Sequence, residues 1–230
     1  MKSEDSWNVD NTTCNKHGCV TKTHDKWNGC VTDRGNSGGP HIDNYDQNVT
    51  APGTLAASKW PAEQYSACTQ AMMGLNYDWT AMRTMVDNMV ANGSTNQPIG
   101  LVWGWQSLVG GGPLTAPAED PAYTYRKIII LLSDGLNTQD RWYGGGSSVS
   151  TNVDKRMYDP ATGLGTCANI KAAGITIYAI QVNTGGDPTS TLLRNCASAT
   201  DKFFELKSAD QIVATFETIG TYLTKLRLAR

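Results

Sequence analysis

Six cysteines are the residues with the most definite chemistry in this 230-residue chain. Thiols either oxidise in pairs or bind a metal as thiolates, so two interpretations are open. Candidate zinc ligands gather near the amino terminus, at Cys14, His17, Cys19, His24 and Cys30. Because Cys-x4-Cys with a histidine between is not a standard zinc spacing, we favour three disulfides. The pairs that we expect are Cys14–Cys19, Cys30–Cys68 and Cys167–Cys196, although six cysteines allow other pairings.

A glycine-rich stretch at residues 35–40, Gly-Asn-Ser-Gly-Gly-Pro, contains a candidate nucleophile. It resembles the loop around the catalytic serine of chymotrypsin-like proteases, with Ser37 as the serine and Asn36 in place of an aspartate. A protease of this kind also needs a catalytic histidine and a catalytic aspartate, which precede the serine in the sequence, and a fold of two β-barrels. Too little chain precedes Ser37 to hold them, and the sequence after it has an α/β pattern. A glycine-rich turn is therefore the favoured interpretation, and a serine hydrolase is the lesser alternative.

Charge and hydropathy exclude several classes of partner. Nineteen basic and 21 acidic residues give a formal charge of −2, so a broad basic surface for nucleic acid is not expected. The longest apolar run, at residues 128–132, is far shorter than the roughly 20 residues that span a bilayer. Residues 1–5 lack the apolar segment of a signal peptide. Either the thiols are reduced in the cytosol, or an export signal lies upstream of Met1.

The chain divides near residue 70 into two predicted parts. Residues 1–69 show almost no periodicity and are predicted to form a loop-rich, disulfide-bearing segment. Residues 70–230 show regular helical and strand patterns. Helices are predicted over 79–90, 99–108, 166–173, 191–198 and 208–226, the last opened by a Ser208-x-x-Gln211 capping box. A variable loop is predicted at residues 144–150.

Three short apolar runs alternate with these helices. Residues 127–132 are rich in β-branched residues, which is typical of a parallel strand buried on both faces. Residues 175–182 and 203–206 are predicted to be the second and third strands. Strand, helix, strand, helix indicates an α/β fold with a parallel sheet and right-handed crossovers. Because sheets of this kind usually have about five or six strands, this sheet is predicted to be incomplete, with an uncovered edge at 127–132.

Several segments together resemble the von Willebrand factor type A domain, and more narrowly the A-type domain of the TadG family of bacterial Tad (Flp) pilus assembly proteins. The resemblance covers most of the chain from residue 27 onward. Its segments are residues 93–105 and 129–138, supported by 27–34, 167–175, 195–198 and 226–228. It implies a Rossmann-like sheet flanked by helices in three layers, from which the first strands are missing.

The family's metal-ion-dependent adhesion site binds Mg²⁺, which prefers hard oxygen ligands and keeps several waters, one of which a partner's carboxylate replaces. Thr95 matches the family's threonine ligand, and Asp134 matches its last aspartate. The Asp-x-Ser-x-Ser element that supplies the other ligands has no counterpart here. The resemblance therefore implies a partial site, with Mg²⁺ expected in a longer protein and no tight binding by this chain alone. In the structural alternative, Thr95 only caps a helix and Asp134 only shapes a turn with Gly135.

The function implied by the resemblance is protein binding without catalysis, during pilus assembly at the bacterial envelope. A periplasmic or cell-surface location would account for the cysteines. It further implies a membrane anchor upstream of Met1, the present chain being the carboxyl-terminal portion. One alternative is a free-standing secreted or surface A-type adhesin that binds its ligand through residues 1–69. The other is the hydrolase using Ser37.

Overall fold

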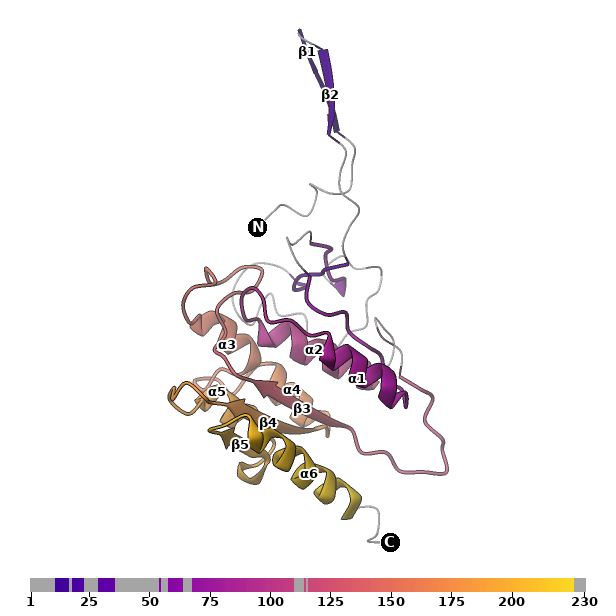
Figure 1. Cartoon of the computed structure of the whole chain (residues 1–230), viewed down its shortest axis with the longest axis vertical. Coiled ribbons are helices and arrows are strands. Elements are labelled where there is room, and N and C mark those ends of the chain that lie inside the picture. The colour runs from indigo at the N-terminus through magenta and orange to yellow at the C-terminus, as the bar shows by residue number, and fades with distance from the viewer. Residues whose placement is uncertain are drawn as a thin grey trace.

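The computed structural model describes residues 11–16, 18–22, 29–35, 54, 58–63, 68–109, 114 and 116–225. At its centre lies a three-stranded parallel sheet in the order β3-β4-β5, with helices on both faces (Figure 1). The strands are β3 (Ile128–Ser133), β4 (Thr176–Val182) and β5 (Phe203–Leu206). The predicted α/β class, with a parallel sheet between helices as in Rossmann-like folds, is confirmed.

Strand β4 is the central strand of the sheet. It pairs with β3 from Thr176 to Gln181 and with β5 from Ala179 to Val182. All of its residues after Thr176 are buried. A near-continuous apolar run is what a parallel strand covered on both faces requires, so the sequence of β4 and its position agree.

Strand β3 departs from the prediction that residues 127–132 are buried on both faces. In the described part of the chain only β4 pairs with it, so β3 is an edge strand. Ile130 is 37% exposed and Leu132 is 44% exposed, although Ile129 is buried. The prediction of double-sided burial is wrong for β3, because α6 covers one face only in part and, among the described residues, no element lies beyond the free edge. The uncovered edge that was expected is present in the described structure.

The two faces of the sheet are covered unequally (Figure 1). Four helices pack on one face and enclose the largest apolar cluster, centred on Trp105, Ile129 and Ile177. These helices are α2 (Gln97–Val109), α3 (Thr151–Met157), α4 (Thr166–Ala172) and α5 (Thr191–Cys196). A single helix, α6 (Asp210–Lys225), covers the other face through Ile219 and neighbouring apolar residues. Helix α6 does not extend over all of β3, so the β3 side chains on this face are partly exposed.

Most helix ends lie within two residues of the prediction, but α1 is shorter than predicted and α3 was not predicted. Helix α1 (Trp79–Asp87) begins at Trp79, as predicted, after an N-cap at Asp78, but it ends before Val90 and buries none of its residues. Helix α3 was missed, because its seven residues are too few for a helical period to stand out after the loop at 144–150. A 3₁₀ turn (Thr200–Lys202) precedes β5.

In the described part of the segment before residue 70, β1 (Asn11–Asn15) and β2 (Gly18–Lys22) form a hairpin that the sequence did not predict. The backbone register puts Cys14 opposite Cys19; their side chains lie outside the described part, so this pair stays a prediction. Disulfides join Cys30 to Cys68 and Cys167 to Cys196, the pairs expected from the sequence. Covalent bonds of this kind are typical of an oxidising compartment.

Candidate functional site

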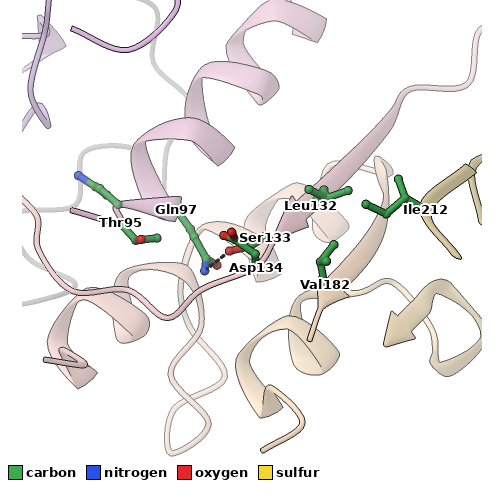
Figure 2. Close-up of a pocket in the computed structure, with 8 residues that line it drawn as sticks. Thr95, Gln97, Leu132, Ser133, Asp134, Val182 and Ile212 are labelled. Atoms are coloured by element: carbon green, nitrogen blue, oxygen red, sulfur yellow. Dashed lines mark hydrogen bonds between the residues drawn. The ribbon is translucent and has the colours of Figure 1, made fainter. Parts of the chain in front are cut away.

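A cavity of about 420 Å³ opens at the carboxyl end of β3, against the amino end of α2 (Figure 2). The carboxyl edge of a parallel α/β sheet is where such folds usually bind ligands. One wall is polar and the other is apolar. The residues that line it are Thr95, Asn96, Gln97, Leu132, Ser133, Asp134, Val182 and Ile212.

The two predicted site residues, Thr95 and Asp134, line this same cavity although 39 positions separate them in the sequence. Thr95 lies just before α2, and Asp134 follows the last residue of β3. The two loops approach closely, since a Cβ built on Gly135 would lie 3.6 Å from the hydroxyl oxygen of Thr95. The structure therefore brings the predicted pair together at one edge of the sheet.

Neighbouring residues perform the structural tasks considered for this pair. Asn96, not Thr95, caps α2, because its side-chain oxygen accepts from the backbone N–H of Ile99 at 3.3 Å. The turn after β3 is closed by Ser133, whose hydroxyl oxygen accepts from the backbone N–H of Gly135 at 3.3 Å. Within the described residues, the Thr95 hydroxyl and the Asp134 carboxylate make no hydrogen bond or ion pair of their own.

Gln97 also lines the cavity. The side chain is only 8% exposed, and its amide nitrogen donates to the Ser133 hydroxyl at 2.9 Å and to the Gly135 carbonyl at 2.9 Å. Those two bonds fix the amide, since both partners accept. Its oxygen Oε1 is buried and has no hydrogen-bond partner in the part of the chain that the structure describes. We define the β3 site as Thr95, Gln97, Ser133 and Asp134.

A second loop holds the β3 site in place. The backbone N–H of Thr95 donates to the Thr138 hydroxyl at 2.9 Å, and the Thr138 N–H returns a bond to the Thr95 carbonyl at 2.9 Å. Asn137, which is fully buried, accepts from the backbone N–H of Gln97 at 2.8 Å and donates to Asp154 of α3 at 2.9 Å. Burial raises the pKa of the Asp154 carboxyl, and the bond from Asn137 opposes that shift.

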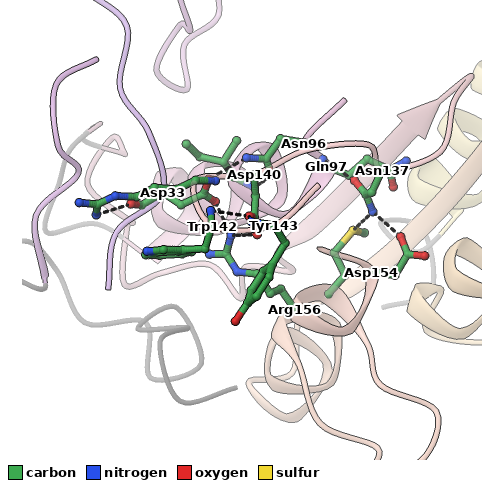
Figure 3. A network of polar contacts seen from close by, with 12 residues as sticks. Asp33, Asn96, Gln97, Asn137, Asp140, Trp142, Tyr143, Asp154 and Arg156 are labelled. Atoms are coloured by element: carbon green, nitrogen blue, oxygen red, sulfur yellow. Dashed lines mark hydrogen bonds and ion pairs between the residues drawn. The ribbon is translucent and has the colours of Figure 1, made fainter. Parts of the chain in front are cut away.

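A separate polar group, the Arg156 cluster, lies beside this loop (Figure 3). The Arg156 guanidinium contacts Asp33 at 2.7 Å and Asp140 at 2.8 Å, and all three side chains are almost completely buried. Asp140 also accepts from the backbone N–H of Trp142 at 2.8 Å. Asp33 accepts from the Asn96 side chain at 2.7 Å, which ties the amino-terminal segment to the start of α2.

The sequence did not predict the Arg156 cluster. Asp33 and Arg156 are 123 positions apart, and neither belongs to a motif with a known spacing. The only sequence signal was that Asp33 falls within residues 27–34, a segment of the resemblance to which no role was given. The cluster fastens the described part of the amino-terminal segment to α3.

The alternative chemistries concern residues that mostly fall outside the described ranges. The structure does not describe Ser37, His17, His24 or His41, so it tests neither the hydrolase interpretation nor the zinc interpretation. Over the residues described, no group of three or more His, Cys, Asp or Glu side chains could hold a metal ion. No helix among them is long and apolar enough to cross a membrane.

Comparisons of this chain with protein-family models, with curated proteins and with solved structures find no match. The chemistry of the site therefore rests on its own geometry: an oxygen-lined cavity with one carboxylate, at the ligand-binding edge of a parallel sheet.

Proposed function

We propose that this chain is a non-enzymatic protein-binding domain of the von Willebrand factor A type, resembling the TadG component of Tad (Flp) pilus assembly, and that it binds pilus assembly components or a surface ligand at the bacterial envelope. The proposal rests on the resemblance in the sequence and is supported by the position of the β3 site. A parallel sheet whose carboxyl edge presents oxygen ligands is the arrangement that such domains use for binding.

In the structure, the proposal rests mainly on one observation, that the Thr95 and Asp134 side chains have no partner among the described residues. Both side chains line the same cavity, and neighbours cap the helix and close the turn in their place. A carboxylate and a hydroxyl that line one cavity and have no other partner in the described structure are placed for a ligand.

The donor set fits Mg²⁺ in kind. Asp134 supplies a carboxylate, Thr95 a hydroxyl, and Gln97 a buried amide oxygen without a partner in the described part of the chain. Mg²⁺ bound there would supply a positive centre that accepts a carboxylate from a protein partner. With one carboxylate, the β3 site gives little charge to offset dehydration of the ion. We therefore expect weak binding by this chain alone.

Disulfides at Cys30–Cys68 and Cys167–Cys196 support a location outside the cytoplasm, on the periplasmic or cell-surface side. Contact with pilus assembly components or a surface ligand would take place there. Thiol trapping in the producing bacterium tests this part of the proposal. Both pairs should resist alkylation in the exported protein, and free thiols at these positions would contradict an envelope location.

Mn²⁺, which replaces Mg²⁺ with similar ligands, provides the test of the site. The measurement is the free Mn²⁺ signal in electron paramagnetic resonance during a titration. Wild type should bind one ion with Kd on the order of 1 mM, and Asp134→Ala or Thr95→Ala should abolish that binding. The matched control is Asp87→Ala, which removes an exposed carboxylate from α1 and should change nothing.

Two results would contradict this account of the site. Micromolar binding by the wild type would show that its ligand set is more complete than we propose. Binding that survives Asp134→Ala would place the ion elsewhere on the protein.

A further inference from the structure

The free edge of β3 lacks the features that normally protect an edge strand. Natural edges carry charged residues, proline or a bulge that prevents pairing with another chain. Residues 128–133 of β3, Ile-Ile-Ile-Leu-Leu-Ser, contain neither a charge nor a proline. Ile130 and Leu132 are 37% and 44% exposed on the face that α6 covers only in part. An unprotected apolar edge of this kind is a surface for strand addition.

The strand that pairs there must be apolar on both of its faces. Ile129 and Leu131 of β3 point to the α2 face, and Ile128, Ile130 and Leu132 point to the α6 face. Within the described chain, the continuous apolar strands are β3 and β4, and β4 is already paired on both sides. A second copy of β3 meets the requirement.

We propose that two copies of this chain pair through antiparallel β3 strands, about a two-fold axis that passes through Ile130. In this register Ile128 lies opposite Leu132 of the second copy, and Ile129 lies opposite Leu131. Ile130 meets its own counterpart. Directly opposed residues share a face of the sheet, so every contact along the seam joins two aliphatic side chains. The product is a continuous six-stranded sheet, a common size.

Charge complementarity selects this register. Continuing it beyond β3 puts Arg126 opposite Asp134 of the second copy, and the two-fold axis repeats the pair at the other end. Both side chains are exposed, and neither forms an ion pair within the described residues. Lys127, whose ammonium contacts Glu119 at 2.9 Å, lies opposite Ser133. Two ion pairs thus flank an apolar seam.

The neighbouring registers lack this match. With the axis at Ile129, Arg126 and Lys127 face Leu132 and Leu131. With the axis at Leu131, Asp134 faces Ile128. The first shift places two charges against aliphatic side chains and the second places one, and the two-fold axis repeats each contact, which disfavours both registers.

Sedimentation or light scattering gives the first test. The wild type should have about twice the 24.8 kDa mass of one chain at tens of micromolar. Ile130→Lys places two like charges on the axis and should yield a monomer with an unchanged circular dichroism spectrum. Val213→Lys, a change at a 65% exposed residue of α6, is the matched control and should stay dimeric. A monomeric wild type, including one that pairs only with a different protein, would overturn the proposal.

Cross-linking tests the axis directly. Because opposed Cβ atoms in antiparallel strands lie about 5 Å apart, Ile130→Cys should form an intermolecular disulfide under mild oxidation. Val213→Cys should not. A wild-type dimer in which Ile130→Cys fails to cross-link would overturn the β3 seam.

Charge reversal tests the register. Asp134→Arg and Arg126→Asp should each weaken the dimer, by roughly tenfold in Kd. The double variant should restore wild-type dimerisation, because it re-forms both pairs with their charges exchanged. Single variants that leave the dimer unchanged, or a double variant without rescue, would exclude this register. The dimer readouts are taken without metal, and Mn²⁺ binding is measured on the monomeric Ile130→Lys variant, in which Asp134 is not engaged by Arg126 of a second copy. A failed dimer and a failed β3 site are then distinguishable.

Discussion

Two polar groups flank the start of α2, and they differ in whether their charges are paired. In the Arg156 cluster, Asp33 and Asp140 both contact the guanidinium of Arg156, and all three are buried. In the β3 site, Asp134 is exposed and has no partner among the residues described, and Thr95 uses its backbone but not its hydroxyl. The first group has its partners within the protein, and the second does not.

The contrast distinguishes polar side chains that stabilise the fold from polar side chains that are placed to bind a ligand. A buried ion costs several kcal/mol to desolvate, so it is kept only where partners compensate it, and losing one partner is severe. An exposed carboxylate without a partner contributes little to folding, so its position is free to serve a ligand. Asn137 lies between the groups, since it holds the backbone of α2 and contacts Asp154 of α3. Substitutions across this series should therefore have graded effects.

The largest effect is expected from Asp140→Ala. It leaves Arg156 buried with one carboxylate fewer and removes the acceptor of the Trp142 backbone N–H. We expect the free energy of unfolding in urea to fall by about 3–5 kcal/mol. Asp134→Ala is the control and should change it by less than about 0.5 kcal/mol. Equal losses in the two variants would remove the distinction between the groups.

A smaller loss is expected from Asn137→Ala. The backbone N–H of Gln97 and the carboxyl of Asp154 both lose a buried partner. Urea unfolding should show a loss of about 1–3 kcal/mol. Asn92→Ala, at an exposed position before α2, serves as the comparison. If Asn137→Ala behaved like that control, the loop would not depend on this bridge.

Asp154 gives a pH-dependent effect of smaller size. Its folded pKa is raised above the ordinary value of 3.8 by burial, so ionisation costs stability. The stability that it contributes is fully present below pH 3.8 and is lost as the pH rises through the folded pKa. Asp154→Asn should therefore match the wild type at low pH and gain on it above the folded pKa. Unfolding curves that differ by the same amount at every pH would contradict the raised pKa.

The smallest effect on folding is expected from Thr95→Ala. The Thr95 backbone makes the bonds to Thr138, and Asn96 caps α2, so the hydroxyl is dispensable for the fold. The free energy of unfolding should change by less than about 0.5 kcal/mol. The same protein should no longer bind Mn²⁺. A clear loss of stability would show that the Thr95 hydroxyl stabilises the fold.

Local patterns were enough to predict most of the sheet and its helices. The runs that became β3, β4 and β5 are apolar and short, and the capping glutamine Gln211 does bond back to the N–H of Ser208, at 3.2 Å. Burial of β3 could not be predicted, because composition shows what a strand needs and not what lies beside it. The seven-residue helix α3 was too short to leave a periodic signal.

The candidate site was predictable only in part. Thr95 and Asp134 were identified through a resemblance, and both then line one cavity. Gln97 was missed, since a glutamine in the first turn of a helix carries no signal until its amide is seen buried against Ser133. Asp33 was missed as a partner of Arg156, because contacts across more than a hundred residues arise from the tertiary fold.

Paramagnetic broadening tests the central distinction most directly. Substoichiometric Mn²⁺ added to ¹⁵N-labelled protein broadens the amide signals nearest to the ion. We predict that the amides of Thr95, Asn96 and Gly135 broaden first, and that those of Trp142 and Tyr143, beside the Arg156 cluster, broaden only at higher concentration. Broadening that begins at Trp142 and Tyr143, or that spreads evenly over exposed carboxylates, would contradict the assignment of the β3 site as the place where this protein binds a ligand.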